Sequence, residues 1–172
     1  MPKVTLTSRE VLKQAIGCCQ AGQLDKSAAL CRAVLNVNPD YFGANFLLGI
    51  VQGRLDQWQE ALASYEKALA VRPDSVQALV NVGTVLRRLN RLQPALASYE
   101  KALAIEPNHV GALNGLASTA LDVCDWTRTP KIAAQIVQDL TAKGPVVFPF
   151  SLLVYCDDPR LQLEASKNYV AT

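Results

Sequence analysis

The 172-residue sequence has few aromatic residues, one of the residue types that are typical of sheets. Aromatic residues make up 6% of it, whereas alanine and leucine together occupy 47 positions. This balance favours packed helices over a β-sandwich or barrel, which would draw on aromatic and β-branched residues. No run of about 18 apolar residues occurs, so we expect no membrane-spanning segment.

The sequence also lacks the motifs of common catalytic and metal sites. It has one histidine, His109, and five cysteines, none in a C-x-x-C spacing. We therefore expect no zinc site, no cofactor and no catalytic activity in this chain. The cysteines are interpreted as reduced residues that fill the core, and His109 as a turn residue.

Charge and the N-terminal sequence exclude two further classes. A formal net charge of +2 gives no general attraction to nucleic acid. The first residues contain no apolar stretch with a cleavage site, so we expect a cytoplasmic protein without a secretory signal. Neither nucleic acid nor a membrane is expected among its partners.

An internal repeat of 34 residues organises the chain. The string ALASYEKALA occurs at 61–70 and again at 95–104. Prolines recur at the same offset, at Pro39, Pro73 and Pro107. Such self-similarity is the signature of a repeat architecture. With each proline at position 32 of a unit, the repeats span 8–41, 42–75 and 76–109, and a degenerate fourth unit starts at 110.

Small residues recur at three positions of the unit, where they allow two helices to approach closely. Each unit carries two apolar patterns at i, i+3, i+4 and i+7, which predict a pair of helices. Pro73 predicts the end of one helix, and Asp74 is predicted to cap the next. The recurring small residues are Ala15, Gly49, Gly83 and Ala117 at position 8, Ser27, Ala61 and Ala95 at position 20, and Val34, Ala68 and Ala102 at position 27; position 24 holds Cys31, Tyr65 and Tyr99.

This pattern resembles the tetratricopeptide repeat family, whose period is 34 and whose Gly, Ala, aromatic and Pro positions it matches. The resemblance implies an all-α fold, a right-handed α-solenoid of about three to four helix pairs with a C-terminal helical cap. The solenoid would extend over 8–141 and a capping or linker segment over 142–172. Asp158 and Pro159 predict the start of a short last helix. The ends of the solenoid are candidate surfaces for self-association.

The C-terminal part has a second resemblance, to SPINDLY-like proteins of the O-linked N-acetylglucosamine transferase type. In those proteins a Cys-Asp-Trp stretch, a Pro-Phe pair and an Asp-Asp-Pro before Gln-Leu lie between the repeats and the catalytic region. The resemblance implies a UDP-sugar-dependent glycosyltransferase region of the GT-B type beyond residue 172. The matching residues are Cys124, Asp125, Trp126, Pro149, Phe150, Asp157, Asp158, Pro159, Gln162 and Leu163.

The tetratricopeptide resemblance also implies a concave binding face, formed by positions 2, 5, 6, 9, 12 and 13 of each first helix. Arginines there can hold carboxylates bidentately, and asparagine amides can bind a peptide backbone. The transferase family has an asparagine ladder at position 6; here Asn81 alone has that position, so the ladder departs from the family pattern. The candidate partner-binding residues are Arg54, Gln77, Asn81, Thr84, Arg87, Arg88, Asn114 and Ser118.

These observations predict a non-catalytic module that binds a protein or an extended peptide in its groove. The first hypothesis is the substrate-docking repeat region of a transferase of the O-linked N-acetylglucosamine type. The alternative is a free-standing repeat adaptor whose tail caps the solenoid. For Arg87 and Arg88 the competing interpretation is a solvated surface without a ligand.

Overall fold

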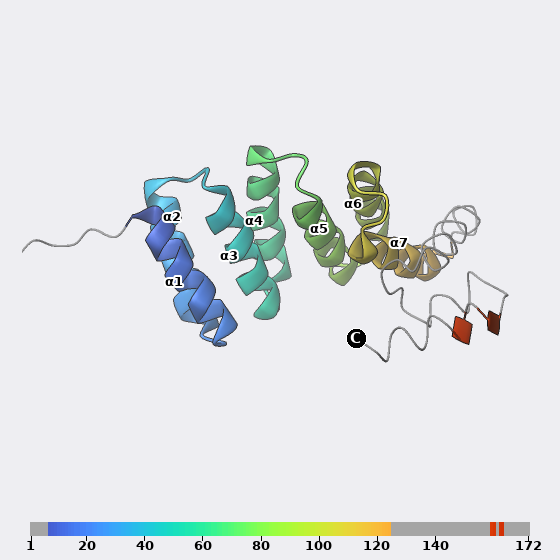
Figure 1. Ribbon diagram of the computed structural model, residues 1–172, viewed down its shortest axis with the longest axis horizontal. Coiled ribbons are helices and arrows are strands. Elements are labelled where there is room, and N and C mark those ends of the chain that lie inside the picture. Colours follow the sequence, from blue (N-terminus) through green and yellow to red (C-terminus); the bar gives the residue numbers. More distant parts are fainter. Residues whose placement is uncertain (1–6, 125–158, 161, 164–172) are drawn as a thin grey trace, which may run out of the picture.

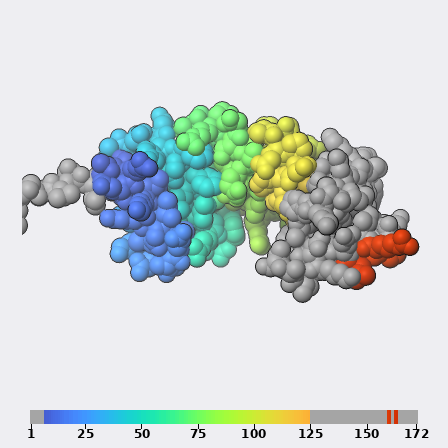
Figure 2. Space-filling model, in the orientation of Figure 1, coloured from blue at the N-terminus to red at the C-terminus, as the bar shows by residue number. Residues whose placement is uncertain are grey.

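The computed structural model describes residues 7–124, 159, 160, 162 and 163, and its fold is all-α, as the sequence predicts (Figure 1). Within 7–124 the helices follow one another along the long axis of the molecule, and each packs against the next. The space-filling view shows an elongated body (Figure 2). The helices are α1 (Ser8–Gln20), α2 (Leu24–Val37), α3 (Phe42–Arg54), α4 (Trp58–Val71), α5 (Val76–Arg88), α6 (Leu92–Ile105) and α7 (Val110–Asp122).

The first helix of every pair begins 34 residues after the previous one. The four starts are Ser8, Phe42, Val76 and Val110. First helices of neighbouring repeats also contact each other, α1 with α3 and α5 with α7. Because each repeat contacts only its neighbours, side chains of the first helices line one continuous side of the stack.

The turn that follows each of the four first helices contains one residue in the left-handed conformation. These residues are again 34 apart: Gly22 (φ 75°), Asp56 (φ 58°), Asn90 (φ 57°) and Cys124 (φ 53°). Glycine adopts positive φ without strain, and Asp and Asn tolerate it better than other residues. The first three turns therefore have suitable residues, whereas Cys124 adopts this conformation without such a preference.

Three of the described helices, α1, α5 and α7, have a side-chain cap at their start, and one of these caps differs from the prediction. Thr7 and Glu10 form a reciprocal capping box at α1. The cap of α5 is Ser75, whose Oγ accepts a hydrogen bond from the Ala78 N–H at 3.4 Å. The prediction of Asp74 as this cap was wrong, because the helix begins one residue later than that assignment requires. His109 caps α7 from the turn through Nδ1.

Tyrosine rings fill the space between the two helices of a pair. Tyr65 and Tyr99 are buried, at 4% and 2% exposure. A Cβ atom on Gly49 would lie 2.6 Å from the Tyr65 ring, so only glycine leaves room for the ring there. The first repeat has Ala15 and Cys31 at the equivalent positions, and both are fully buried. In the first repeat, the smaller side chain at position 24 is therefore compensated by a larger one at position 8 than in the second and third repeats.

The C-terminal part lies mainly outside the described residues. Residues 159, 160, 162 and 163 are helical, in agreement with the short helix predicted after Asp158. Residues 125–158 lie outside the described residues. The boundary at 141/142 between a solenoid and a capping segment, and the resemblance that includes Trp126 and Asp157, therefore stay predictions. In the part of the chain that the structure describes, no helix is long and apolar enough to cross a membrane.

Candidate interaction groove

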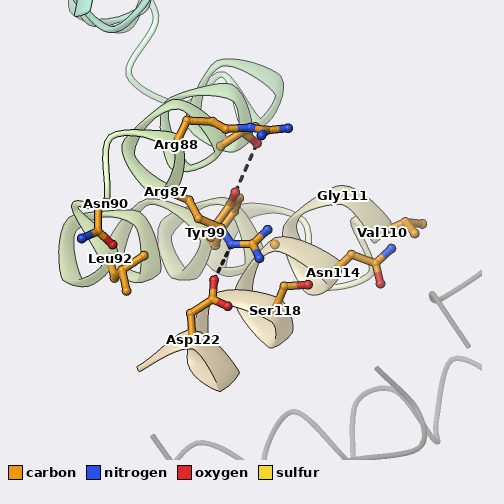
Figure 3. A pocket seen from close by; sticks show the side chains of 12 residues that line it. Arg87, Arg88, Asn90, Leu92, Tyr99, Val110, Gly111, Asn114, Ser118 and Asp122 are labelled. Atoms are coloured by element: carbon orange, nitrogen blue, oxygen red, sulfur yellow. Dashed lines mark hydrogen bonds and ion pairs between the residues drawn. The ribbon is translucent and has the colours of Figure 1, made fainter. Parts of the chain in front are cut away.

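Two adjoining hollows lie on the side of the stack formed by the first helices. The aromatic hollow lies between repeats two and three, and the polar hollow between repeats three and four (Figure 3). Thr84 of α5 lines both, so together they form one groove. The aromatic hollow is lined by Phe46, Ile50, Gly53, Arg54, Trp58, Tyr65, Gln77, Asn81, Thr84 and Val85. The polar hollow is lined by Thr84, Arg87, Arg88, Asn90, Leu92, Tyr99, Val110, Gly111, Asn114, Gly115, Ser118 and Asp122.

All eight candidate residues predicted from the sequence line this groove. Three of them line the aromatic hollow alone, four line the polar hollow alone, and Thr84 lines both. The first three are Arg54, Gln77 and Asn81, and the next four are Arg87, Arg88, Asn114 and Ser118. Asn114 is buried, at 8% exposure, which leaves little of its amide for a ligand. The groove therefore brings the candidates together, while their role in binding stays a prediction.

Arg54 links the first two repeats. Its Nη1 donates a hydrogen bond of 2.7 Å to the carbonyl oxygen of Cys19, near the C-terminus of α1. A cation at this end of a helix interacts favourably with the unpaired carbonyls and the helix dipole. The side chain of Arg54 is exposed and lines the aromatic hollow, and its guanidinium has N–H groups besides those on Nη1.

Arg88 has the repeat position equivalent to Arg54 but a different neighbour. Its guanidinium carbon lies 5.6 Å from the centroid of the Trp58 ring, which is a cation–π distance. The guanidinium keeps its hydrogen-bond donors in this arrangement, because the ring interacts with the face of the group. Arg88 is exposed and borders the polar hollow.

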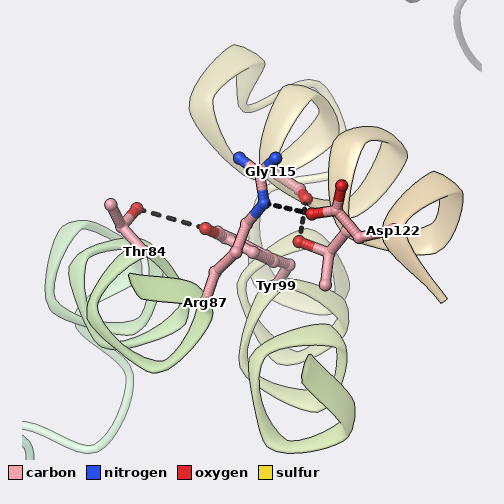
Figure 4. A network of polar contacts seen from close by, with 6 residues as sticks. Thr84, Arg87, Tyr99, Gly115 and Asp122 are labelled. Atoms are coloured by element: carbon pink, nitrogen blue, oxygen red, sulfur yellow. Dashed lines mark hydrogen bonds and ion pairs between the residues drawn. The ribbon is translucent and has the colours of Figure 1, made fainter. Parts of the chain in front are cut away.

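Arg87, next to Arg88 in sequence, is held in an ion pair. Its Nε donates to Oδ2 of Asp122 at 2.7 Å, joining α5 to the last residue of α7 (Figure 4). The exposed fractions of the two side chains are 42% and 40%. Solvent therefore screens the pair, and we expect it to contribute no more than about 1 kcal/mol to stability.

Tyrosine hydroxyls mark the floor of both hollows. The Tyr99 hydroxyl lies 3.1 Å from Oγ1 of Thr84, within hydrogen-bond distance (Figure 4). Burial raises the pKa of Tyr99, and the hydrogen bond with Thr84 lowers it to a smaller extent. Burial likewise raises the pKa of Tyr65, partly offset by a hydrogen bond with Asn81. Both hydroxyls therefore keep their protons at physiological pH and form hydrogen bonds with side chains of α5.

Sequence reasoning missed several residues of the groove. Phe46 and Ile50 occupy positions 5 and 9 of the second repeat, both on the predicted face, but being apolar they were not selected. Trp58 begins a second helix and reaches the aromatic hollow from there. Asp122 lies 34 residues after Arg88, so the repeat alignment that indicated Arg54 and Arg88 also contained the signal for it.

The described residues offer no metal centre. In residues 7–124 and the four described residues near the C-terminus, no group of three or more His, Cys, Asp or Glu side chains is placed to hold an ion. The groove is thus built from arginine, amide, hydroxyl and aromatic groups, which suit recognition of a polypeptide.

Stacked helix pairs of this kind define the class of helical-repeat proteins. Residues 40–108 match the family model of the tetratricopeptide repeat. The helix pairs α3/α4 and α5/α6, which lie within these residues, are therefore similar to tetratricopeptide repeats. No curated protein sequence matches the chain.

Solved structures share this fold. A crystal structure of MamA superposes with a TM-score of 0.75 at 17% identity, covering 80% of this chain and 80% of that one. MamA from residue 41 to its end, from Desulfovibrio magneticus RS-1, gives a TM-score of 0.71 at 18% identity over 80% and 76% of the chains. The first TPR domain of Spaghetti (RPAP3), bound to the HSP90 peptide SRMEEVD, gives 0.66 at 19% identity over 71% and 99%. At these identities the similarity shows the fold alone.

Proposed function

We propose that the groove binds an extended segment of a partner protein that carries carboxylate groups. The observation that carries this proposal is the row of three arginines, Arg54, Arg87 and Arg88, along two adjoining hollows. Asp122 is the one acidic residue among the residues that line them. The groove therefore has an excess of positive charge that attracts and orients an acidic peptide.

The two hollows provide complementary contacts along a peptide. In the aromatic hollow, Phe46 and Trp58 offer apolar area and the Asn81 amide offers a donor and an acceptor for a peptide backbone. In the polar hollow, Ser118 and Thr84 offer hydroxyl groups. A structural relative supports the choice of ligand, since the RPAP3 repeats were solved with SRMEEVD, a peptide rich in carboxylates.

The test is a titration of purified protein with fluorescein-labelled SRMEEVD and with an equally labelled analogue whose residues carry no carboxylate, SRMQQVN with an amidated C-terminus. We expect micromolar or weaker binding of the acidic peptide, because a few exposed ion pairs contribute little each. Binding should weaken as salt is raised from 50 to 300 mM, since salt screens exposed charges. The analogue should bind at least several-fold more weakly.

A double variant assigns this binding to the groove. Arg54→Gln/Arg88→Gln should reduce the affinity for the acidic peptide about tenfold. The matched control is Lys67→Gln/Lys101→Gln, which removes the same charge from exposed positions of α4 and α6 that line neither hollow. Equal affinity in both double variants would show that the arginines form a solvated surface.

The second candidate function is substrate docking for a transferase of the O-linked N-acetylglucosamine type. Its support is the resemblance of the segment that begins at Cys124, most of which lies outside the described residues. The coding sequence after residue 172 tests it: an open frame for a GT-B region supports the docking role, and a stop codon leaves a free-standing adaptor. A cytoplasmic location and self-association through the ends of the stack also stay predictions.

A further inference from the structure

The helix α7, which is the first helix of the fourth repeat, ends in a residue of different charge from those that end α1, α3 and α5. Position 13 of the repeat holds Gln20, Arg54, Arg88 and then Asp122. Each of these is the last residue of its helix. A cation is favourable at a helix C-terminus and a carboxylate is unfavourable. Asp122 therefore occupies a place where helix electrostatics disfavour it, and its partner across the groove is Arg87.

The ion pair shows which chemical group fits Arg87. Oδ2 of Asp122 lies 2.7 Å from Nε of Arg87, on the edge of the hollow that would receive the ligand (Figure 3). A ligand carboxylate that binds Arg87 through Nε would need the same N–H, and one that binds the other nitrogens would meet the negative charge of Asp122 beside it. Asp122 and such a ligand therefore compete for one guanidinium.

We propose that Asp122 is an internal competitor that blocks Arg87, so that the ligand carboxylate binds at Arg54 and Arg88. This inference rests on the proposed function and assigns the position of the acidic group along the groove. Arg88 contacts the neutral ring of Trp58, and Arg54 donates to the neutral Cys19 carbonyl, so both keep N–H donors and a positive charge that no carboxylate compensates. The carboxylate then lies beside the aromatic hollow, and the peptide presents an apolar residue to Phe46 and Trp58.

Competition by Asp122 is effective because it belongs to the same chain. A free carboxylate loses translational freedom on binding, and the tethered one does not. The pair is half-exposed and weak, so the effect of this block on ligand affinity should be modest. We expect the block to lower the affinity for an acidic peptide three- to fivefold.

A double-mutant cycle on Arg87 and Asp122 tests the competition with labelled SRMEEVD. Asp122→Asn should bind three- to fivefold more tightly than the wild type. Arg87→Ala should bind within twofold of the wild type, because Arg87 is already occupied. In the double variant the gain of Asp122→Asn should disappear. Glu66→Gln, which removes a negative charge from an exposed position of α4 outside both hollows, should leave the affinity unchanged.

A second measurement decides the inference without the peptide. The Nε–H resonance of Arg87 is followed by NMR while inorganic phosphate is added. In Asp122→Asn, the chemical shift of this resonance should reach half of its maximal change at a phosphate concentration several-fold lower than in the wild type. Equal half-saturation in the two proteins, or equal peptide affinity of Asp122→Asn and the wild type, would overturn the inference. If no variant binds the peptide, the proposed function fails and the phosphate titration alone decides whether Asp122 blocks Arg87.

Discussion

The ring of Tyr99 lies directly against Gly83. A Cβ atom on Gly83 would be 2.7 Å from Cε1 of Tyr99 and 2.8 Å from Cζ, closer than non-bonded carbon atoms approach. A Cβ atom on Gly115, in the next repeat, would also overlap this ring. Tyr99 thus fills the space among α5, α6 and α7, and its hydroxyl reaches Thr84 in the groove. The packing that joins two repeats also builds the floor of the interaction site.

Adding one methyl group at Gly83 should destabilise the protein. Alanine is the better helix former by about 1 kcal/mol, but here its methyl group must displace the Tyr99 ring. We expect Gly83→Ala to lower the free energy of unfolding by about 1–3 kcal/mol in urea denaturation. Gly17→Ala is the control, because a Cβ atom on Gly17 in α1 would meet no atom within 4 Å. That variant should gain about 0.5–1 kcal/mol.

Enlarging the small residue at position 27 should have a similar effect. Ala102 is fully buried in α6, so a leucine there must force helices apart. Ala102→Leu should lower the free energy of unfolding by about 1–3 kcal/mol. Ala104→Leu, at an exposed position of the same helix, should change it by less than about 0.5 kcal/mol. An unchanged urea midpoint for Ala102→Leu would contradict the assigned repeat register.

At Asn90, in the turn between α5 and α6, alanine should destabilise the protein more than glycine does. Asn90 has a φ of 57°, a conformation in which a Cβ atom is strained unless the side chain is Asn or Asp. Asn90→Ala should therefore lower the thermal midpoint, at a cost of about 1 kcal/mol, whereas Asn90→Gly should stay within about 0.5 kcal/mol of the wild type. Equal losses in the two variants would indicate a role of the amide group instead of backbone strain.

The protein should lose stability in alkaline solution. Burial, with a smaller contribution from Cys19, raises the pKa of the Cys31 thiol from 9.0 to about 11. Below pH 9 the thiol is protonated in both states, and its contribution to stability is complete. Between pH 9 and 11 the unfolded chain releases the proton and the folded chain keeps it, so the free energy of unfolding falls by up to about 1.4 kcal/mol per pH unit.

Cys31→Ala isolates this contribution. The variant should be less stable at neutral pH because it leaves a small cavity, but its stability should decline less steeply between pH 9 and 10. Above pH 10 both proteins should become less stable, since burial raises the pKa of Tyr65 and of Tyr99 as well. Chemical denaturation at each pH measures the slopes, and parallel slopes from pH 9 to 10 would contradict the assignment to Cys31.

Much of the fold could be predicted because the repeat code is local and periodic. The 34-residue offset of the prolines and of the ALASYEKALA string predicted helix pairs, and the structure has them. The small residues at positions 8, 20 and 27 are buried, since they lie where two helices cross. The cap of α5 was assigned to Asp74 instead of Ser75, because adjacent Asp and Ser residues are both good caps and the sequence does not distinguish them.

The groove could be predicted only in part. Repeat positions indicated the eight polar and charged candidates, and all of them line the two hollows. The aromatic contribution of Trp58 was missed, because this residue belongs to a second helix and reaches the groove only through the packing of α4 against α3. Asp122 was missed because its role in the groove depends on its ion pair with Arg87, which only the tertiary structure shows.

The sequence by itself determined the helix pairs, their 34-residue period and the size of the side chain at each crossing, because these depend on neighbours along the chain and on a repeated steric pattern. Only the tertiary structure decided which charges meet. Arg87 and Asp122 are 35 residues apart, as are Cys19 and Arg54, and the rotation between successive repeats places each pair within 2.7 Å. That rotation results from the packing of all the helices together, so equivalent positions such as Arg54, Arg88 and Asp122 acquire three different partners.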